Sequence, residues 1–140
     1  MDNGIVVNQK FLDDYVLPSR PSHNWEKYYQ LKQGDVVVEG GAFWGKFGII
    51  ASPKVGPTGT VILIEANPFY TPVIEFVINT LKLENTTLIK AAVWKEKIKL
   101  QFSISGGASK IIGCNPGGGK ELNVVEARAD TLDNILSELN

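Results

Sequence analysis

Two glutamates and two glycines stand where a parallel α/β protein commonly binds a ligand. Glu39 ends the apolar run that begins at Val36, and Gly41 and Gly45 follow it. Glycines after a buried strand let the backbone turn tightly and approach a ligand at the N-terminus of the next helix. Glu65 ends a second apolar run, twenty residues after Gly45. Because a carboxylate there can accept hydrogen bonds from both hydroxyls of a ribose, the spacing favours a nucleoside-containing cofactor.

Glu39 bears on which cofactor such a site would take. A dinucleotide places its pyrophosphate at the helix N-terminus, where a carboxylate directly before the glycines would repel it. S-adenosylmethionine carries an ammonium and a sulfonium and no phosphate, so it is compatible with Glu39. A nicotinamide-dinucleotide site is also disfavoured because a clean G-x-G-x-x-G is missing. A purely structural alternative stays open, in which the glycines serve helix–strand packing and Glu65 is a charge at a strand end.

The elements that must position these residues alternate along the first ninety or so residues. Short apolar runs predict buried strands at 35–39, 60–65 and 86–93. Helical patterns predict helices at about 22–31 with its aromatics inward, at 44–52, and at 73–83 after Thr71 as N-cap and Pro72 as first helical residue. Pro53 and the turn after it are expected to end the second helix. The alternation predicts an α/β protein with a Rossmann-like parallel sheet.

The last third of the chain has a different pattern. Residues 97–104 alternate strictly between apolar and polar side chains, which predicts a half-exposed antiparallel strand near a sheet edge. Residues 105–121 carry six of the 14 glycines and are expected to form a mobile loop. Residues 122–129 could pair with the alternating strand. Residues 130–140 predict an amphipathic helix with Thr131 as N-cap and an apolar stripe of Leu132, Ile135, Leu136 and Leu139.

Length and composition limit the classes of protein that fit. A chain of 140 residues with 44% hydrophobic and 21% charged residues predicts one globular domain over residues 1–140. A net charge of -1 without long charged blocks gives no support for nucleic acid or a membrane surface as partner. Cys114 is the only cysteine, so we expect no internal disulfide and a reducing, cytoplasmic location. No secretion signal or membrane span is expected.

Other reactive residues give weaker signals. His23 is the only histidine, and a surface or helix-start role is favoured over a catalytic base. Cys114 has no histidine at a meaningful spacing, so neither a metal site nor a cysteine nucleophile is expected. The glycines before Lys120 lack the spacing of a phosphate-binding loop. Phe43 and Trp44 lie in the glycine turn itself, and one of them is expected to cap the site. No catalytic residue is identified.

Four segments together resemble a known family. They read LKQGDVVVEGGAFWGKFGIIAS, VILIEANP, NTTLIKAAVWKEK and ADTLDNIL, in this order over residues 31–136. In order and spacing they resemble the motifs of the FkbM-type methyltransferases, a branch of the class I S-adenosylmethionine-dependent enzymes. In the first motif, usually D-V-G-A-N-x-G, Glu39 stands for the aspartate and Phe43 replaces the asparagine, while the matching positions are Gly41, Ala42 and Gly45. The usual E-P-N-P appears as Glu65, Ala66, Asn67 and Pro68.

The resemblance implies a methyltransferase that uses S-adenosylmethionine, with methyl transfer to an oxygen of a small molecule or sugar. It implies that Glu39 reaches the methionine amino group and that Glu65 holds the ribose hydroxyls. The backbone from Gly41 to Gly45 would line the methionine and ribose, and Ala91 and Ala92 would flank the adenine. The complete implied site is Glu39, Gly41, Ala42, Phe43, Gly45, Glu65, Ala66, Asn67, Ala91 and Ala92.

The chain also departs from that family. Family enzymes continue into a fourth parallel strand with a K-x-D-x-E-G-type motif, over which the substrate lies, whereas this chain ends at Asn140. The expected strands are likewise fewer than the family's usual count of about seven. Three explanations stay open: a C-terminally truncated domain, a compact variant that dimerises, or a module that keeps the cofactor pocket, lacks catalysis and acts in assembly. Because the first strand would leave an apolar edge unpaired, we expect a homodimer that buries it.

Overall fold

The central unit of the protein is a three-stranded parallel sheet. The computed structural model describes residues 8–17, 27–105, 108–112 and 124–139. The strands lie in the order β1-β2-β3 and all pair in parallel. The elements are β1 (Val36–Gly40), α2 (Lys46–Val55), β2 (Thr60–Ile64), α3 (Thr71–Leu81) and β3 (Thr86–Ile89). The predicted α/β class with a Rossmann-like order of elements is therefore confirmed, with a parallel sheet that has fewer strands than a complete fold of this kind.

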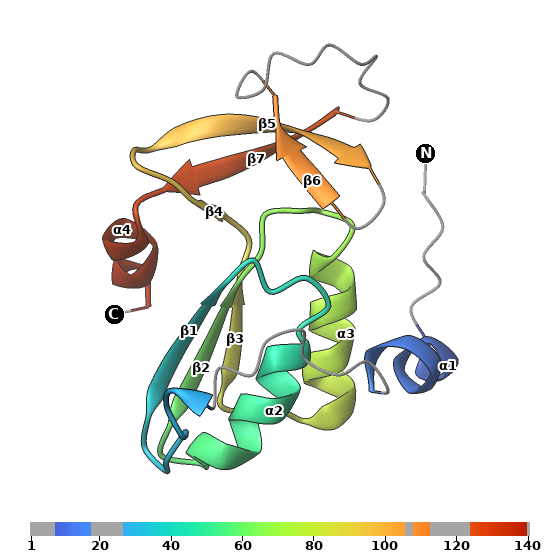
Figure 1. Cartoon of the computed structure of the whole chain (residues 1–140), viewed down its shortest axis with the longest axis vertical. Helices are drawn as coiled ribbons and strands as arrows, with labels where there is room; N and C mark the ends of the chain where they lie inside the picture. Colours follow the sequence, from blue (N-terminus) through green and yellow to red (C-terminus); the bar gives the residue numbers. More distant parts are fainter. Residues whose placement is uncertain (1–7, 18–26, 106–107, 113–123, 140) are drawn as a thin grey trace.

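The continuous apolar run of β2 follows from its central position. Val61 and Leu63 pack into a core with Val55 of α2 and Ile74 of α3. The alternate residues, Ile62 and Ile64, face the other side of the sheet, where Ile135 completes a second cluster. Because successive side chains of a strand point to opposite faces, a strand covered on both faces needs apolar residues throughout. Figure 1 shows α2 and α3 together on one side of the sheet.

A second sheet lies at the carboxyl end of the first, as Figure 1 shows. Its strands are β4 (Ala92–Val93), β5 (Ile98–Ser105), β6 (Ala108–Ile111) and β7 (Val124–Asp130), in the order β4-β7-β5-β6. The predicted strand at 86–93 is therefore wrong as a single element, because the chain leaves the first sheet after Ile89 and enters the second at Ala92. Hydropathy cannot detect such a change of sheet, because both parts are apolar.

The antiparallel pairing of β5 with β7 confirms that these two segments pair. β5 is the second strand from one edge of this sheet, next to β6, which agrees with the predicted position near a sheet edge. β6 corrects part of the predicted loop at 105–121. Its backbone pairing from Ala108 to Ile111 stabilises a strand that the glycines around it obscure. The rest of that loop, apart from Ser105 and Ile112, lies outside the described residues.

The N-terminal part of the chain was not predicted correctly. A short helix, α1 (Gln9–Phe11), leads into a π-helical turn, η1 (Leu12–Val16). Leu12 and Val16 are fully buried against α3 in a third cluster. The predicted helix at about 22–31 is wrong over 28–31, which are not helical, and residues 22–26 lie outside the described part. Of its aromatics, the two that are described do not face inward, since Tyr28 and Tyr29 are exposed and the Tyr29 hydroxyl donates to the Asp35 carboxylate.

The observed helix ends agree with the predicted ends only in part. Tyr70 occupies the N-cap position of α3, so Thr71 is its first helical residue rather than its cap. Pro53 lies inside the last turns of α2, which continues to Val55. The final helix, α4 (Leu132–Ser137), does begin as predicted, because the Thr131 side chain accepts the Asn134 N–H at 3.3 Å.

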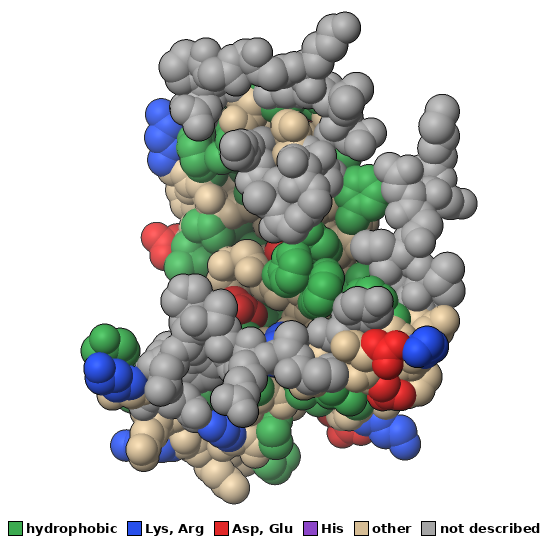
Figure 2. Space-filling view, turned by 45° about the vertical axis from the view of Figure 1, so that its right-hand side comes forward, with side chains coloured by type: hydrophobic (Ala, Val, Ile, Leu, Met, Phe, Trp, Pro, Cys, Tyr) green, Lys and Arg blue, Asp and Glu red, His purple; other side chains and the backbone are tan. Residues whose placement is uncertain are grey.

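The apolar stripe of α4 is buried only at its centre. Ile135 is fully buried, whereas Leu132 and Leu139 expose 40% and 44% of their surface. Figure 2 shows further hydrophobic side chains gathered in the middle of one face of the molecule. No helix of the described residues has the length and apolar character needed to cross a membrane.

β1 is an edge strand in the described structure. It pairs only with β2 among the described strands, so its other side has no strand partner there. Val36 and Val38, on the face shared with Ile62 and Ile64, expose 68% and 37% of their surface. The only charged residue on this strand is Glu39. Natural edge strands commonly carry lysine, proline or a bulge that prevents pairing, and β1 has none of these.

Candidate functional site

The turn from β1 to α2 is built from left-handed backbone. Gly41, Phe43 and Gly45 have φ angles of 82°, 54° and 73°. The Gly41 N–H and the Ala42 N–H both donate to the Ile64 carbonyl, at 2.8 and 3.1 Å, which fixes the turn to the end of β2. A Cβ on Gly45 would lie 3.3 Å from the Ile74 side chain. Glycine at position 45 therefore serves both the turn conformation and the close packing of α2 on α3.

Phe43 adopts a conformation that its side chain disfavours. A left-handed backbone conformation is uncommon for residues other than glycine, asparagine and aspartate. For any other residue it costs about 1–3 kcal/mol. The Phe43 ring stacks on Trp44, with 4.6 Å between centroids, and meets the edge of Tyr70 at 4.4 Å. Aromatic pairs of this kind contribute about 0.5–1.5 kcal/mol each. These two contacts can offset the strain, which explains how a phenylalanine is accommodated in this conformation.

Glu65 is buried and fixed by two backbone donors. It exposes only 8% of its surface. Its Oε2 accepts the Phe43 N–H at 2.8 Å, and its Oε1 accepts the Asn67 N–H at 2.7 Å. Glu65 thus joins the end of β2 to the β1–α2 turn. Each carboxylate oxygen has two lone pairs, so each can accept one further hydrogen bond from a ligand.

A cavity of about 330 Å³ opens beside Glu65 at the carboxyl ends of the parallel strands. Five of the site residues predicted from the sequence line it, namely Gly41, Glu65, Ala66, Ala91 and Ala92. Val93 of β4 and Phe102 of β5 also line it, and the sequence did not indicate either of them. Apart from Glu65, the side chains around this cavity are small, aliphatic or aromatic. Such walls around one carboxylate suit a flat ring that is joined to a group with hydroxyls.

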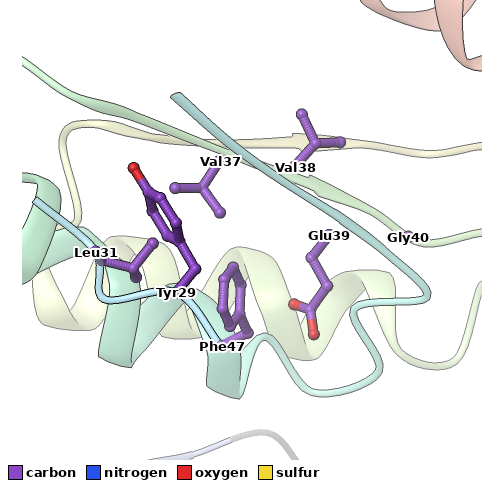
Figure 3. A pocket seen from close by; sticks show the side chains of 7 residues that line it. All are labelled: Tyr29, Leu31, Val37, Val38, Glu39, Gly40 and Phe47. Carbon is purple, nitrogen blue, oxygen red and sulfur yellow. The ribbon is translucent and has the colours of Figure 1, made fainter. Parts of the chain in front are cut away.

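Glu39 lies in a neighbouring cavity of about 370 Å³. Its other lining residues are Tyr29, Leu31, Val37, Val38, Gly40 and Phe47. Figure 3 shows the Glu39 carboxylate on the same side of β1 as the Phe47 ring, with Val38 on the opposite side. Gly40 lines both cavities, so the two carboxylates belong to adjoining spaces. The structure therefore divides the predicted site between two cavities that meet at the end of β1.

Little in the described structure offsets the burial of the Glu39 carboxylate. Its Oε2 is buried, with no hydrogen-bond partner among the described residues. Burial, and secondarily the nearby Glu65 carboxylate, raise the pKa of Glu39 to about 8. Glu39 is consequently protonated for the most part at neutral pH. A cation that entered this space would favour the ionised form, so the arrangement suits a positively charged ligand.

Four predicted site residues line neither cavity. Ala42 is buried in the core, and Gly45 and Phe43 shape the turn. The Asn67 side-chain oxygen accepts the Phe69 N–H at 2.9 Å, which shapes the start of α3. These contacts place all four beside the site as structural residues.

Other residues considered from the sequence contribute nothing to the described site. His23, Cys114 and Lys120 lie outside the described residues. Within the described ranges, no group of three or more His, Cys, Asp or Glu side chains is arranged to hold a metal ion.

No protein-family model matches the chain, and no curated protein matches it in sequence. Among solved structures, it is similar to a SAM-dependent methyltransferase from Aquifex aeolicus, at 23% identity and a TM-score of 0.46 over 66% of this chain and 45% of that one. It is also similar to a protein-L-isoaspartate O-methyltransferase, at 22% identity and a TM-score of 0.46 over 49% of this chain and 22% of that one.

A third similar structure is Aeropyrum pernix fibrillarin with natively bound S-adenosyl-L-methionine, at 23% identity and a TM-score of 0.41. The match covers 44% of this chain and 26% of fibrillarin. The chain thus spans less than half the length of each of these three proteins. Only one of the three names states a methyl acceptor, and the comparisons indicate none for this chain.

Proposed function

We propose that this chain binds S-adenosylmethionine at the carboxyl ends of β1, β2 and β3 and serves as a methyltransferase. The observation that carries the proposal is the pair of carboxylates at the adjoining cavities. Glu65 is held rigidly with spare acceptor capacity, and Glu39 has a buried oxygen that accepts no hydrogen bond from the described residues. A ligand that carries ribose hydroxyls and, farther along the same molecule, an ammonium satisfies both.

The chain's own residues would bind and orient this cofactor. Glu65 would accept hydrogen bonds from the ribose hydroxyls. Ala91 and Ala92 leave room for the adenine ring beside Glu65. Glu39 would take the amino group of the methionine portion, in its ionised form. When bound, S-adenosylmethionine would supply an activated methyl group for transfer to an acceptor oxygen. Catalysis of such a step depends mainly on holding the reactants in line.

The acceptor is proposed to be a hydroxyl of a small molecule or sugar. This part of the proposal is supported only by the resemblance of the four motifs to FkbM-type enzymes. The described cavities contain no side chain that we assign as a catalytic base.

A second candidate function is cofactor binding without catalysis. Both Glu65 oxygens already accept backbone N–H groups, so this residue stabilises the turn whether or not a ligand binds. A module of this kind would act in assembly. A nicotinamide-dinucleotide site is a weaker candidate, because its pyrophosphate would lie near two carboxylates, Glu39 and Glu65.

The open edge of β1 supports the further proposal of a homodimer. Pairing of β1 with its copy would satisfy the backbone groups on its free side and cover Val36 and Val38. A cytoplasmic location stays a prediction from the single cysteine.

Calorimetric titration with S-adenosylhomocysteine tests the proposal. We expect a dissociation constant in the micromolar range for the wild-type protein and no heat with NADH. Glu65→Gln keeps the size of the side chain but replaces one acceptor oxygen by a donor, so it should weaken binding at least tenfold. Glu96→Gln, at a side chain that is 57% exposed, is the matched control and should bind normally. A folded wild-type sample that binds neither ligand would contradict the proposal.

A further inference from the structure

The second sheet is attached directly at the carboxyl end of the first. Only Lys90 and Ala91 separate β3 from β4. The Trp94 N–H donates to the Asp130 carbonyl at 2.7 Å, and the Arg128 guanidinium donates to the Lys90 carbonyl at 3.3 Å. These bonds tie β7 to the connection between the sheets. The second sheet is therefore held above the carboxyl ends of the parallel strands, as Figure 1 shows, and the cavity beside Glu65 opens at these strand ends.

Phe102 reaches that cavity from the middle of the second sheet. Its Cα is paired with Val125 on β7 and with Ile111 on β6, so strands on both sides hold its backbone. Leu100, two residues earlier and on the same face, is 7% exposed, which identifies this face as the inner one. The Phe102 ring lines the same cavity as Glu65, Ala66 and Ala91.

Packing in the apolar core does not explain why an aromatic ring lies at position 102. Phe102 is half-buried, and it belongs to none of the three apolar clusters that form the core of the described residues. An aromatic ring on a rigid strand, exposed to a cavity with aliphatic walls from Ile64 and Val93, offers a stacking surface. Stacking of a base on an aromatic side chain is sequence-tolerant and contributes substantially to binding.

We propose that Phe102 is the side chain that contacts the face of the adenine ring, so that the second sheet completes the nucleoside pocket. This inference rests on the proposed function and adds to it a residue that none of the four motifs contains as a ligand contact. Phe102 then acts as a binding residue for the base, whereas Glu65 acts on the ribose and Glu39 on the amino group. Each of the three residues thus contacts a different part of the ligand.

That division allows a test with ligand fragments. Titrations of S-adenosylhomocysteine and of adenosine are followed by calorimetry and by ¹H NMR. Phe102→Leu should lower the affinity for both ligands by the same factor, about tenfold or more. Phe102→Tyr keeps a stacking ring and should retain the wild-type affinity. Glu39→Gln should weaken S-adenosylhomocysteine alone, because adenosine has no amino-acid portion. Gln101→Ala, at the exposed neighbouring position on β5, is the control.

A measurement on the wild-type protein makes the test independent of how the variants fold. Nuclear Overhauser contacts are expected between the adenine protons of bound S-adenosylhomocysteine and the Phe102 ring. Absence of these contacts in a saturated complex would overturn the inference, as would unchanged affinity in a folded Phe102→Leu protein. Loss of S-adenosylhomocysteine binding without loss of adenosine binding would also overturn it. In each of these cases the proposed function stands, whereas a wild-type protein that binds neither ligand would refute the proposed function itself.

Discussion

Replacement of Glu39 by glutamine should change how the stability of the protein depends on pH. In the folded protein, burial and the Glu65 carboxylate raise the pKa of Glu39 to about 8, from an ordinary value of 4.5. Between these two pH values the folded protein retains the proton that the unfolded chain releases. The contribution of Glu39 to stability is therefore largest at or below pH 4.5, and it is lost progressively as the pH rises to about 8. Glutamine imitates the protonated carboxyl and removes this dependence.

The magnitude follows from the two pKa values. The difference corresponds to at most about 5 kcal/mol above pH 8. Because Glu39 is only half-buried, solvent screening lowers the expected effect to about 2 kcal/mol. Glu39→Gln should therefore be more stable than the wild type by about 2 kcal/mol at pH 9 and about equal to it at pH 5.

Urea denaturation at pH 5, 7 and 9, followed by tryptophan fluorescence, measures this difference. Glu96→Gln is the control, since an exposed carboxylate should show no such trend. The same offset between wild type and Glu39→Gln at all three pH values would refute the reasoning. It would mean that Glu39 is ionised and solvated in the folded protein.

Four further predictions follow from particular contacts. At pH 7, binding of S-adenosylhomocysteine should release about 0.9 proton, because its ammonium favours ionised Glu39, and the calorimetric heat should then differ between phosphate and Tris buffers. Phe43→Asn should change the free energy of unfolding by less than about 1 kcal/mol, because relief of strain offsets the lost ring contacts, whereas Phe43→Val should cost about 2 kcal/mol in urea denaturation. Val38→Lys should convert the proposed dimer to a monomer in light scattering, and a wild-type monomer would contradict dimerisation. Thr131→Ala should destabilise by about 1 kcal/mol through loss of the α4 cap, and an unchanged denaturation midpoint would show that the cap is dispensable.

The parallel layer of the fold could be predicted because its signals are local. The short apolar run from Val61 to Ile64 is typical of a strand covered on both faces, and Gly41 and Gly45 favour a turn after the strand that precedes them. The N-cap of α4 was equally local, since one threonine hydroxyl determines it. These features depend on neighbours in the chain, which the sequence displays directly.

The second sheet could be predicted only in part, because its arrangement depends on distant contacts. Alternation in β5 identified the face that contains Leu100 and Phe102, but no sequence pattern shows that this face lies over the end of β2. The break at Lys90 separates two strands that have the same hydropathy. Phe102 was missed as a lining residue for that reason. Similarly, the burial of Leu12 and Val16 against α3 depends on a contact about sixty residues away in the chain.

Part of the arrangement of the candidate site residues could be predicted. The spacing from Gly45 to Glu65 placed Gly41 and Glu65 at the same sheet edge, and both line one cavity. The spacing did not show that Glu39 lines a separate cavity, because the direction of its side chain depends on where β1 ends. The spacing also did not show that backbone N–H groups donate to the Glu65 carboxylate, because the hydrogen bonds from Phe43 and Asn67 form only in the folded turn.

The central claim is that a nucleoside cofactor binds at the carboxyl ends of the parallel strands. A ¹H–¹⁵N NMR titration of the wild-type protein with S-adenosylhomocysteine tests it most directly. We predict saturable shifts of the backbone amides of Gly41, Ala66, Ala91 and Ala92, all of which line the cavity beside Glu65. Unchanged spectra at millimolar ligand, or shifts confined to residues away from this cavity, would contradict the claim.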